Sequence, residues 1–147
     1  MTSMAGTAPL SSSSCAIAVP LRAVDNVQVE AREGAWTVRA TKHVDADDRY
    51  MVGHFPGRTI YPGVFILESL CQAIRNGIGI DAAHWQLVAV HSLRLRKPLL
   101  AGDVMELSAE VTINEAGVVS ARAHCLGAGA AIVASMLVEF GAERQHV

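Results

Sequence analysis

Alternating hydrophobic and polar residues run through most of the chain and predict β-strands. Residues 27–44 alternate and break at Glu33-Gly34, a pattern typical of two short strands joined by a tight turn. The same period of two recurs in residues 86–99, 104–113, 117–126 and 131–140, with LAGD, NEAG and GAG between them. Short connections favour an antiparallel meander, so we expect five or six antiparallel strands.

One segment departs from this alternation and predicts a helix. It starts after Pro62, contains no further proline, and is expected to end near Gly77. Because hydrophobic residues at positions 64–67 point in every direction around the axis, we expect the helix to be buried on nearly all sides. The predicted fold is α+β, a curved antiparallel β-sheet wrapped around a long central α-helix.

The composition adds an expectation of association with a second subunit. The 147 residues suit one domain, which we assign to residues 15–147 behind a flexible N-terminal tail at 1–14. Hydrophobic residues make up 51% of the chain and charged residues 18%, so part of the surface is predicted to be shared. The net charge of -2 argues against a nucleic-acid-binding protein.

Other classes of protein are disfavoured by what the sequence lacks. The three cysteines are far apart without a CxxC pair, and the six histidines have no HxxxH spacing, so we expect no metal site. No apolar run approaches the ~20 residues that span a bilayer. We therefore expect a cytoplasmic protein without a membrane segment.

Candidate chemistry is concentrated in GHFPGRTIYPGVFILESLCQA, residues 53–73. Pro62 lacks an N–H and Gly63 opens the helix, so the amides of Gly63 and Val64 are predicted to lack intrahelical acceptors and to form an anion site. Burial disfavours an ionised carboxylate, so Glu68 is expected to be protonated and able to donate. His54 can accept a proton as a neutral imidazole.

A base, an acid and an oxyanion site together suit proton abstraction next to a carbonyl and loss of a protonated leaving group. Two structural alternatives stay open. Glu68 can simply be hydrogen-bonded to Gln72 at i+4, and His54 can be an ordinary turn residue.

The stretch at 53–73 resembles the FabZ-type 3-hydroxyacyl-ACP dehydratases, which have the hotdog fold. The resemblance extends to VHSLRLRKPLLAGDVMEL and more faintly to PLRAVDNV, and it covers roughly residues 18–140. It implies that His54 and Glu68 are the catalytic residues, contributed by different subunits at a dimer interface. Glutamate at the second position favours simple dehydration, whereas the related dehydratase-isomerases carry aspartate.

The resemblance also implies a reaction without a cofactor. His54 would remove the C2 proton of a (3R)-hydroxyacyl thioester, Glu68 would protonate the departing 3-hydroxyl, and the Gly63 amide, with Val64, would stabilise the thioester oxygen. The product would be a trans-2-enoyl thioester. Three aromatic residues are candidates to line the acyl tunnel: Phe55, Tyr61 and Phe65. Gln72 is expected either to orient Glu68 or simply to solvate the helix.

Basic residues are candidates for docking an acyl carrier protein or the phosphate of its pantetheine arm. They are Arg58, Arg94, Arg96 and Lys97. The alternative is that charges on the strand only protect it from aggregation.

The family's HRYPF stretch is replaced here by AIAVPLRA, which leaves fatty-acid, polyketide and polyene biosynthesis open.

Several assemblies and activities therefore remain possible from the sequence. The expected partner subunit is a second copy in a homodimer, which could assemble into a trimer of dimers, or a different hotdog subunit in a heterodimer. The competing activities are those of an acyl thioesterase and an enoyl-CoA hydratase. A non-catalytic subunit of a heterodimeric dehydratase is the third alternative.

Overall fold

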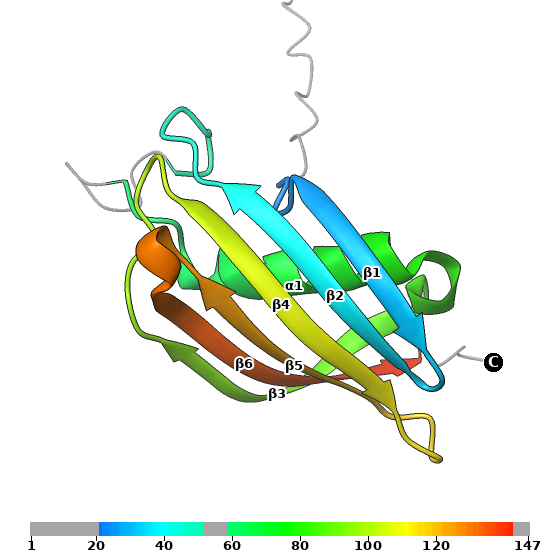
Figure 1. The fold of residues 1–147 in the computed structure, drawn as a ribbon. Helices are drawn as coiled ribbons and strands as arrows, with labels where there is room; N and C mark the ends of the chain where they lie inside the picture. The colour runs from blue at the N-terminus through cyan, green and yellow to red at the C-terminus, as the bar shows by residue number, and fades with distance from the viewer. Residues whose placement is uncertain (1–20, 52–58, 143–147) are drawn as a thin grey trace, which may run out of the picture.

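The computed structural model describes residues 21–51 and 59–142, so the predicted tail at 1–14 lies outside the described residues. It contains one long helix and six strands (Figure 1). In chain order these are β1 (Asn26–Arg32), β2 (Ala35–His43), α1 (Gly63–Ile78), β3 (Trp85–Leu95), β4 (Val104–Ile113), β5 (Val119–Leu126) and β6 (Ile132–Ala142). Short 3-10 turns follow α1 at Gly79–Ala82 and precede β6 at Ala128–Ala130.

All six strands form one antiparallel sheet in the order β1-β2-β4-β5-β6-β3. Helix α1 lies across one face of this sheet (Figure 1) and packs against β1 and β2 near one edge and against β3 at the other. A flat sheet could not bring both edges to the same helix, so the sheet must curve around it. The predicted α+β hotdog arrangement is confirmed.

The prediction of a simple meander is wrong at β3. This strand does not pair with β4, which follows it, but pairs with β6 at the far edge of the sheet, while β2 pairs with β4. The reason is that α1 carries the chain across the inner face, so β3 begins at the opposite edge. The segment that connects β3 to β4 is hydrogen-bonded to the residues before the helix, where Tyr61 N donates to Leu99 O at 2.8 Å.

The hydrophobic core lies between α1 and the inner face of the sheet. The alternation predicted for β4 and β6 holds for the central residues of both strands, which are buried, whereas Ile113 and Ile132 at their ends are exposed. The helix contributes Ile66, Leu70 and Ile74 to the same cluster.

The helix ends at Ile78, one residue beyond the predicted Gly77. Gly79 caps it with a φ of +76°, a left-handed conformation that favours glycine. Gly77 lies inside the helix, where a Cβ would overlap Val29 Cγ2 and lie 2.8 Å from Val27 Cγ1. Glycine at this position therefore allows close packing of α1 on β1.

The prediction that the helix is buried on nearly all sides is also wrong. Val64 is 64% exposed, and Arg75 and Asn76 are exposed as well. The sheet forms a single layer and covers only one side of the helix. The other side carries Val64, Arg75 and Asn76 and is not covered by the described chain; we call it the open flank of α1.

Candidate active site

The first turn of α1 has free backbone donors. Pro62 precedes the helix in an extended conformation, no side chain caps the turn, and no acidic residue lies in it. The carbonyl of Pro62 accepts from Phe65 N at 2.9 Å and Ile66 N at 3.4 Å. Within the described residues no acceptor contacts the amides of Gly63 and Val64, which are therefore available to an anionic oxygen.

A groove of about 370 Å³ opens beside Gly63. It is lined by the helix start and by the residues that end β3 and follow it: Ile60, Tyr61, Gly63, Ile66, Leu95, Arg96, Lys97, Pro98 and Leu99. Leu95 lies directly over Gly63, because a Cβ at position 63 would overlap Leu95 Cδ1. The absence of a side chain on Gly63 thus keeps the groove open beside its amide.

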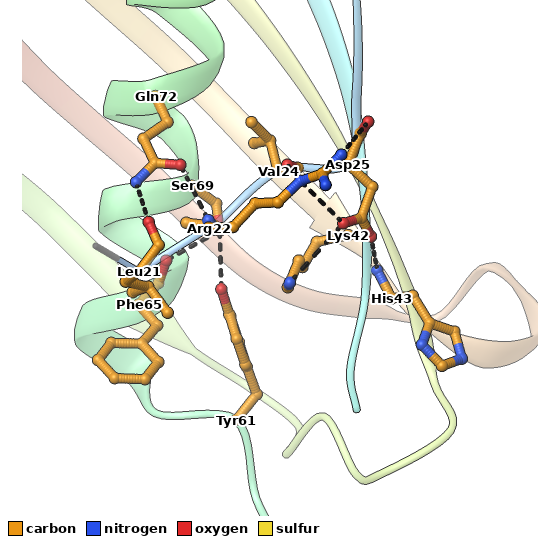
Figure 2. Close-up of polar contacts among 11 residues, drawn as sticks. Leu21, Arg22, Val24, Asp25, Lys42, His43, Tyr61, Phe65, Ser69 and Gln72 are labelled. Carbon is orange, nitrogen blue, oxygen red and sulfur yellow. Dashed lines mark hydrogen bonds and ion pairs between the residues drawn. The ribbon is translucent and has the colours of Figure 1, made fainter. Parts of the chain in front are cut away.

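Tyr61 has a structural contact in addition to its place in the groove. Its hydroxyl lies 3.2 Å from Ser69 Oγ, and Ser69 donates to Phe65 O at 2.9 Å (Figure 2). Burial raises the pKa of Tyr61 to about 12, against the opposing effect of the Ser69 hydrogen bond. The ring packs edge-on against Phe65 at 5.6 Å, and Phe65 packs in the same way against Tyr50 at 6.2 Å.

Glu68 is not in the apolar enclosure that the sequence suggested. Its side chain is 40% exposed, and its Oε1 accepts from Gln72 Nε2 and from Arg75 Nη2, both at 3.1 Å. The carboxylate lies on the open flank of α1, where solvent and a guanidinium replace the expected apolar neighbours. The burial on which the expected protonation of Glu68 depended is therefore not found.

Gln72 also binds the N-terminal segment of the domain, residues 21–25 (Figure 2). Besides contacting Glu68, its Nε2 donates to Leu21 O at 2.8 Å and its Oε1 accepts from Ala23 N at 2.8 Å. The side chain is thus held at both ends of its amide. The predicted contact between Gln72 and Glu68 is present, and the orienting role of Gln72 stays a prediction.

Asp25 holds the same N-terminal segment against the end of β2 (Figure 2). Its Oδ2 accepts from His43 N at 2.6 Å, and its Oδ1 lies 3.8 Å from both Lys42 Nζ and Arg22 Nε. Lys42 is buried, so its charge has a partner where one is needed. These contacts fix the backbone that Gln72 binds.

The remaining predicted site residues fall into two groups. His54, Phe55 and Arg58 lie outside the described residues. Arg94, Arg96 and Lys97 are exposed, and none of them forms an ion pair within the described part of the chain. Arg96 and Lys97 line the groove at Gly63.

Two functional candidates on the outer face of the sheet were not found in the sequence. Arg122 and His124 of β5 line a hollow of about 380 Å³ together with Arg94 and Arg96. Arg96 therefore borders both this hollow and the groove at Gly63. The register of β5, β6 and β3 brings these residues together, and no single strand reveals that register.

The sequence also did not single out Arg75. Its distance of seven residues from Glu68 places both on one side of the helix, and this spacing is the signal that could have found it.

Among the described residues, no group of three or more His, Cys, Asp and Glu side chains is arranged to hold a metal ion. No helix in the same residues is long and apolar enough to cross a membrane.

A family model for the FabA-like domain matches residues 18–135. The chain belongs to this family. It is 35% identical over 106 residues to the 3-hydroxyacyl-[acyl-carrier-protein] dehydratase FabZ of Haemophilus influenzae, an alignment that covers 67% of this chain and 69% of that relative. The FabZ of Nitrosomonas europaea is 32% identical over 106 residues, with 67% and 68% covered.

Solved structures support the fold of this FabA-like chain. An uncharacterized protein from Erwinia carotovora superposes with a TM-score of 0.64 at 20% identity, covering 80% of this chain and 93% of that one. The dehydratase heterocomplex ApeI:P from Xenorhabdus doucetiae superposes with a TM-score of 0.54 at 15% identity, covering 71% and 86%. At these identities the likeness concerns the fold alone.

Proposed function

We propose that this chain dehydrates (3R)-hydroxyacyl thioesters of acyl carrier protein to trans-2-enoyl thioesters, in fatty-acid or polyketide biosynthesis. The observation that carries the proposal is the arrangement of one carboxylate and two free amides on α1. Glu68 lies four residues after Val64 and thus on the same flank of the helix, which the described chain leaves open. The similarity to FabZ relatives supports the substrate class.

In the proposed reaction His54 accepts the C2 proton of the substrate. Negative charge develops on the thioester oxygen, and the free N–H of Gly63 stabilises it with that of Val64 beside it. Glu68 gives a proton to the 3-hydroxyl, the C3–O bond breaks, and water leaves as the C2–C3 double bond forms. No cofactor enters this scheme.

The acyl carrier protein would dock near the mouth of the groove at Gly63. Arg96 and Lys97 line that groove, and Arg96 also borders the outer hollow that contains Arg94. Their charges are not neutralised by any described carboxylate, so they can attract an acidic carrier surface or the phosphate of its pantetheine arm. The proposed role of Arg58 is the same.

The proposed assembly is a homodimer that covers the open flank of α1 and the edge of β3. Leu87, Val90 and Leu95 pair with buried residues of β6 and so face the inner side, yet they are 37%, 45% and 55% exposed. Within the described residues β3 has no neighbour on its outer edge. A second copy would bury this apolar ledge together with Val64.

The assembly is tested by light scattering of the purified chain. A dimer is the expected result, and Val90→Lys should shift it towards monomer, because a charge would replace an apolar contact. A trimer of dimers would extend the proposal. A chain that stays monomeric and becomes dimeric only with a different hotdog subunit would contradict the homodimer.

The activity is tested with a panel of 3-hydroxyacyl carrier-protein substrates of different acyl length, followed by intact mass spectrometry. The expected product has lost one water and is still attached to the carrier. Release of free acid without an enoyl species would identify a thioesterase and overturn the proposal. Conversion of coenzyme A thioesters alone would instead indicate the enoyl-CoA hydratase activity.

A further inference from the structure

The two oxygens of the Glu68 carboxylate have different surroundings. Oε1 accepts two hydrogen bonds, from Gln72 Nε2 and Arg75 Nη2, both at 3.1 Å. Oε2 has no hydrogen-bond partner in the described part of the chain. An oxygen that already accepts from two N–H donors is a poor place for a proton, so a proton on Glu68 would reside on Oε2.

Arg75 is the cation that contacts this carboxylate. It lies in the last turn of α1, where a positive charge also stabilises the helix dipole, but its guanidinium reaches back along the flank to Glu68. Arg22, in the adjacent N-terminal segment, is instead directed to Asp25 and to the Val24 carbonyl.

Cys71 is the other titratable group between Glu68 and Arg75 on the helix. It is buried, and burial, followed by the charge of Glu68, raises the pKa of its thiol to about 11, while Arg75 acts in the opposite direction. The thiol is therefore neutral near neutral pH. Among the described residues, only Arg75 forms an ion pair with Glu68.

We propose that Arg75 is a positioning residue for the general acid of the reaction, an inference that rests on the proposed function. It holds Oε1 together with Gln72, which leaves Oε2 to carry the transferable proton towards the substrate. When that proton passes to the 3-hydroxyl and water leaves, Glu68 becomes a carboxylate beside a guanidinium. Arg75 thereby stabilises the charge that the reaction creates on Glu68.

The expected effect is modest because both side chains are partly exposed, at 45% for Arg75 and 40% for Glu68. Ion pairs of this kind are weakened by solvent, and their usual strength corresponds to a roughly two- to fivefold change in rate. Removing Arg75 takes a positive charge away from the carboxylate that forms on Glu68, so the effect is expected on the chemical step and therefore on kcat.

The test compares Arg75→Gln, Arg75→Lys and the control Arg39→Gln in the full chain. Arg39 is an exposed arginine on β2, away from α1 in the sequence, and its replacement by glutamine removes the same charge as Arg75→Gln. For Arg75→Gln we expect kcat to fall about two- to fivefold with KM unchanged. Arg75→Lys should restore kcat in part, and Arg39→Gln should match the wild type.

Two results would overturn the inference. One is an Arg75→Gln enzyme that matches Arg39→Gln in kcat, and the other is a raised KM with an unchanged kcat, which would mean that Arg75 binds substrate directly. A thermal melt of each variant separates these effects from a loss of folding. Full activity in Glu68→Ala would instead overturn the proposed function, whereas an inactive Glu68→Ala with a normal Arg75→Gln overturns only this inference.

Discussion

Replacing Gly63 with alanine should separate catalysis from stability. A Cβ at this position would overlap Leu95 Cδ1 and lie 3.5 and 3.6 Å from Leu95 Cγ and Cδ2. Leu95 must then move by about 1 Å to reach ordinary van der Waals contact. It is 55% exposed in the single chain and lines the groove beside the Gly63 amide, so we expect it to rotate into that groove.

The two expected magnitudes differ greatly. Alanine in a helix is favoured over glycine by up to about 1 kcal/mol, which offsets the rotation of Leu95, so the free energy of unfolding should change by less than about 1 kcal/mol. A displacement of about 1 Å where the thioester oxygen meets its donor should lower kcat/KM on the order of 10²-fold.

The matched control is Gly77→Ala in the same helix. There a Cβ would overlap Val29 Cγ2 and approach Val27 Cγ1, and the rotation of these branched side chains of β1 is restricted because they pack against the core. Overpacking costs about 1–3 kcal/mol and the helix preference for alanine returns about 1, so the expected loss of stability is up to about 2 kcal/mol. Activity below the melting temperature should be that of the wild type.

The assay measures kcat/KM with a carrier-bound substrate, and denaturant unfolding, for both single variants and for Gly63→Ala/Leu95→Ala. The double variant lacks the side chain that is pushed into the groove, so it should recover activity relative to Gly63→Ala. Wild-type kcat/KM in Gly63→Ala would show that the Gly63 amide does not need an open approach. Equal losses of activity and stability in Gly63→Ala and Gly77→Ala would show that glycine at position 63, like glycine at position 77, is needed only for packing.

Substitutions at two contacts of α1 and at the basic side of the groove should have separable effects on stability and binding. Gln72→Ala removes the partners of Ala23 N and Leu21 O, so we expect about 1–3 kcal/mol less stability in urea and a lower kcat; unchanged stability would show that these contacts contribute little. The pKa of Tyr61 is raised from 10 to about 12, so the stability due to its neutral form is complete below pH 10 and is lost as the pH rises through about 12. Tyr61→Phe should therefore unfold at higher pH than the wild type when followed by circular dichroism, and an unchanged alkaline midpoint would contradict this. Arg96→Glu/Lys97→Glu should raise KM for carrier-bound substrate and leave KM for the same acyl group on free pantetheine unchanged; an equal rise for both would argue against carrier docking.

Local features of the fold could be predicted from the sequence because they depend on neighbouring residues. The alternation around Gly34 gives the β1–β2 hairpin, and Pro62-Gly63 gives the start of α1. The pairing of β3 with β6 could not be predicted in this way, because alternation determines which side chains face inward but not which strand lies alongside.

The surroundings of the candidate acid were harder to predict for a related reason. The apolar residues at the start of α1 cannot show whether they are buried by the chain's own sheet or by a second subunit, and Val64 is exposed in the single chain. The contact of Gln72 with Glu68 follows from the i+4 spacing, whereas the contact of Arg75 depends on a long side chain reaching back two turns. Arg122 joins the cationic hollow only through the register of three strands.

Glu68 and His54 are proposed to remove water together from a carrier-bound 3-hydroxyacyl chain. The most direct measurement is the dehydration rate of Glu68→Ala and of His54→Ala beside the wild type, with intact mass as the readout and light scattering as the check on assembly. We predict that the wild type forms the enoyl product and that both variants form none while their assembly is unchanged. Full dehydration by either variant would mean that Glu68 and His54 are not the catalytic pair.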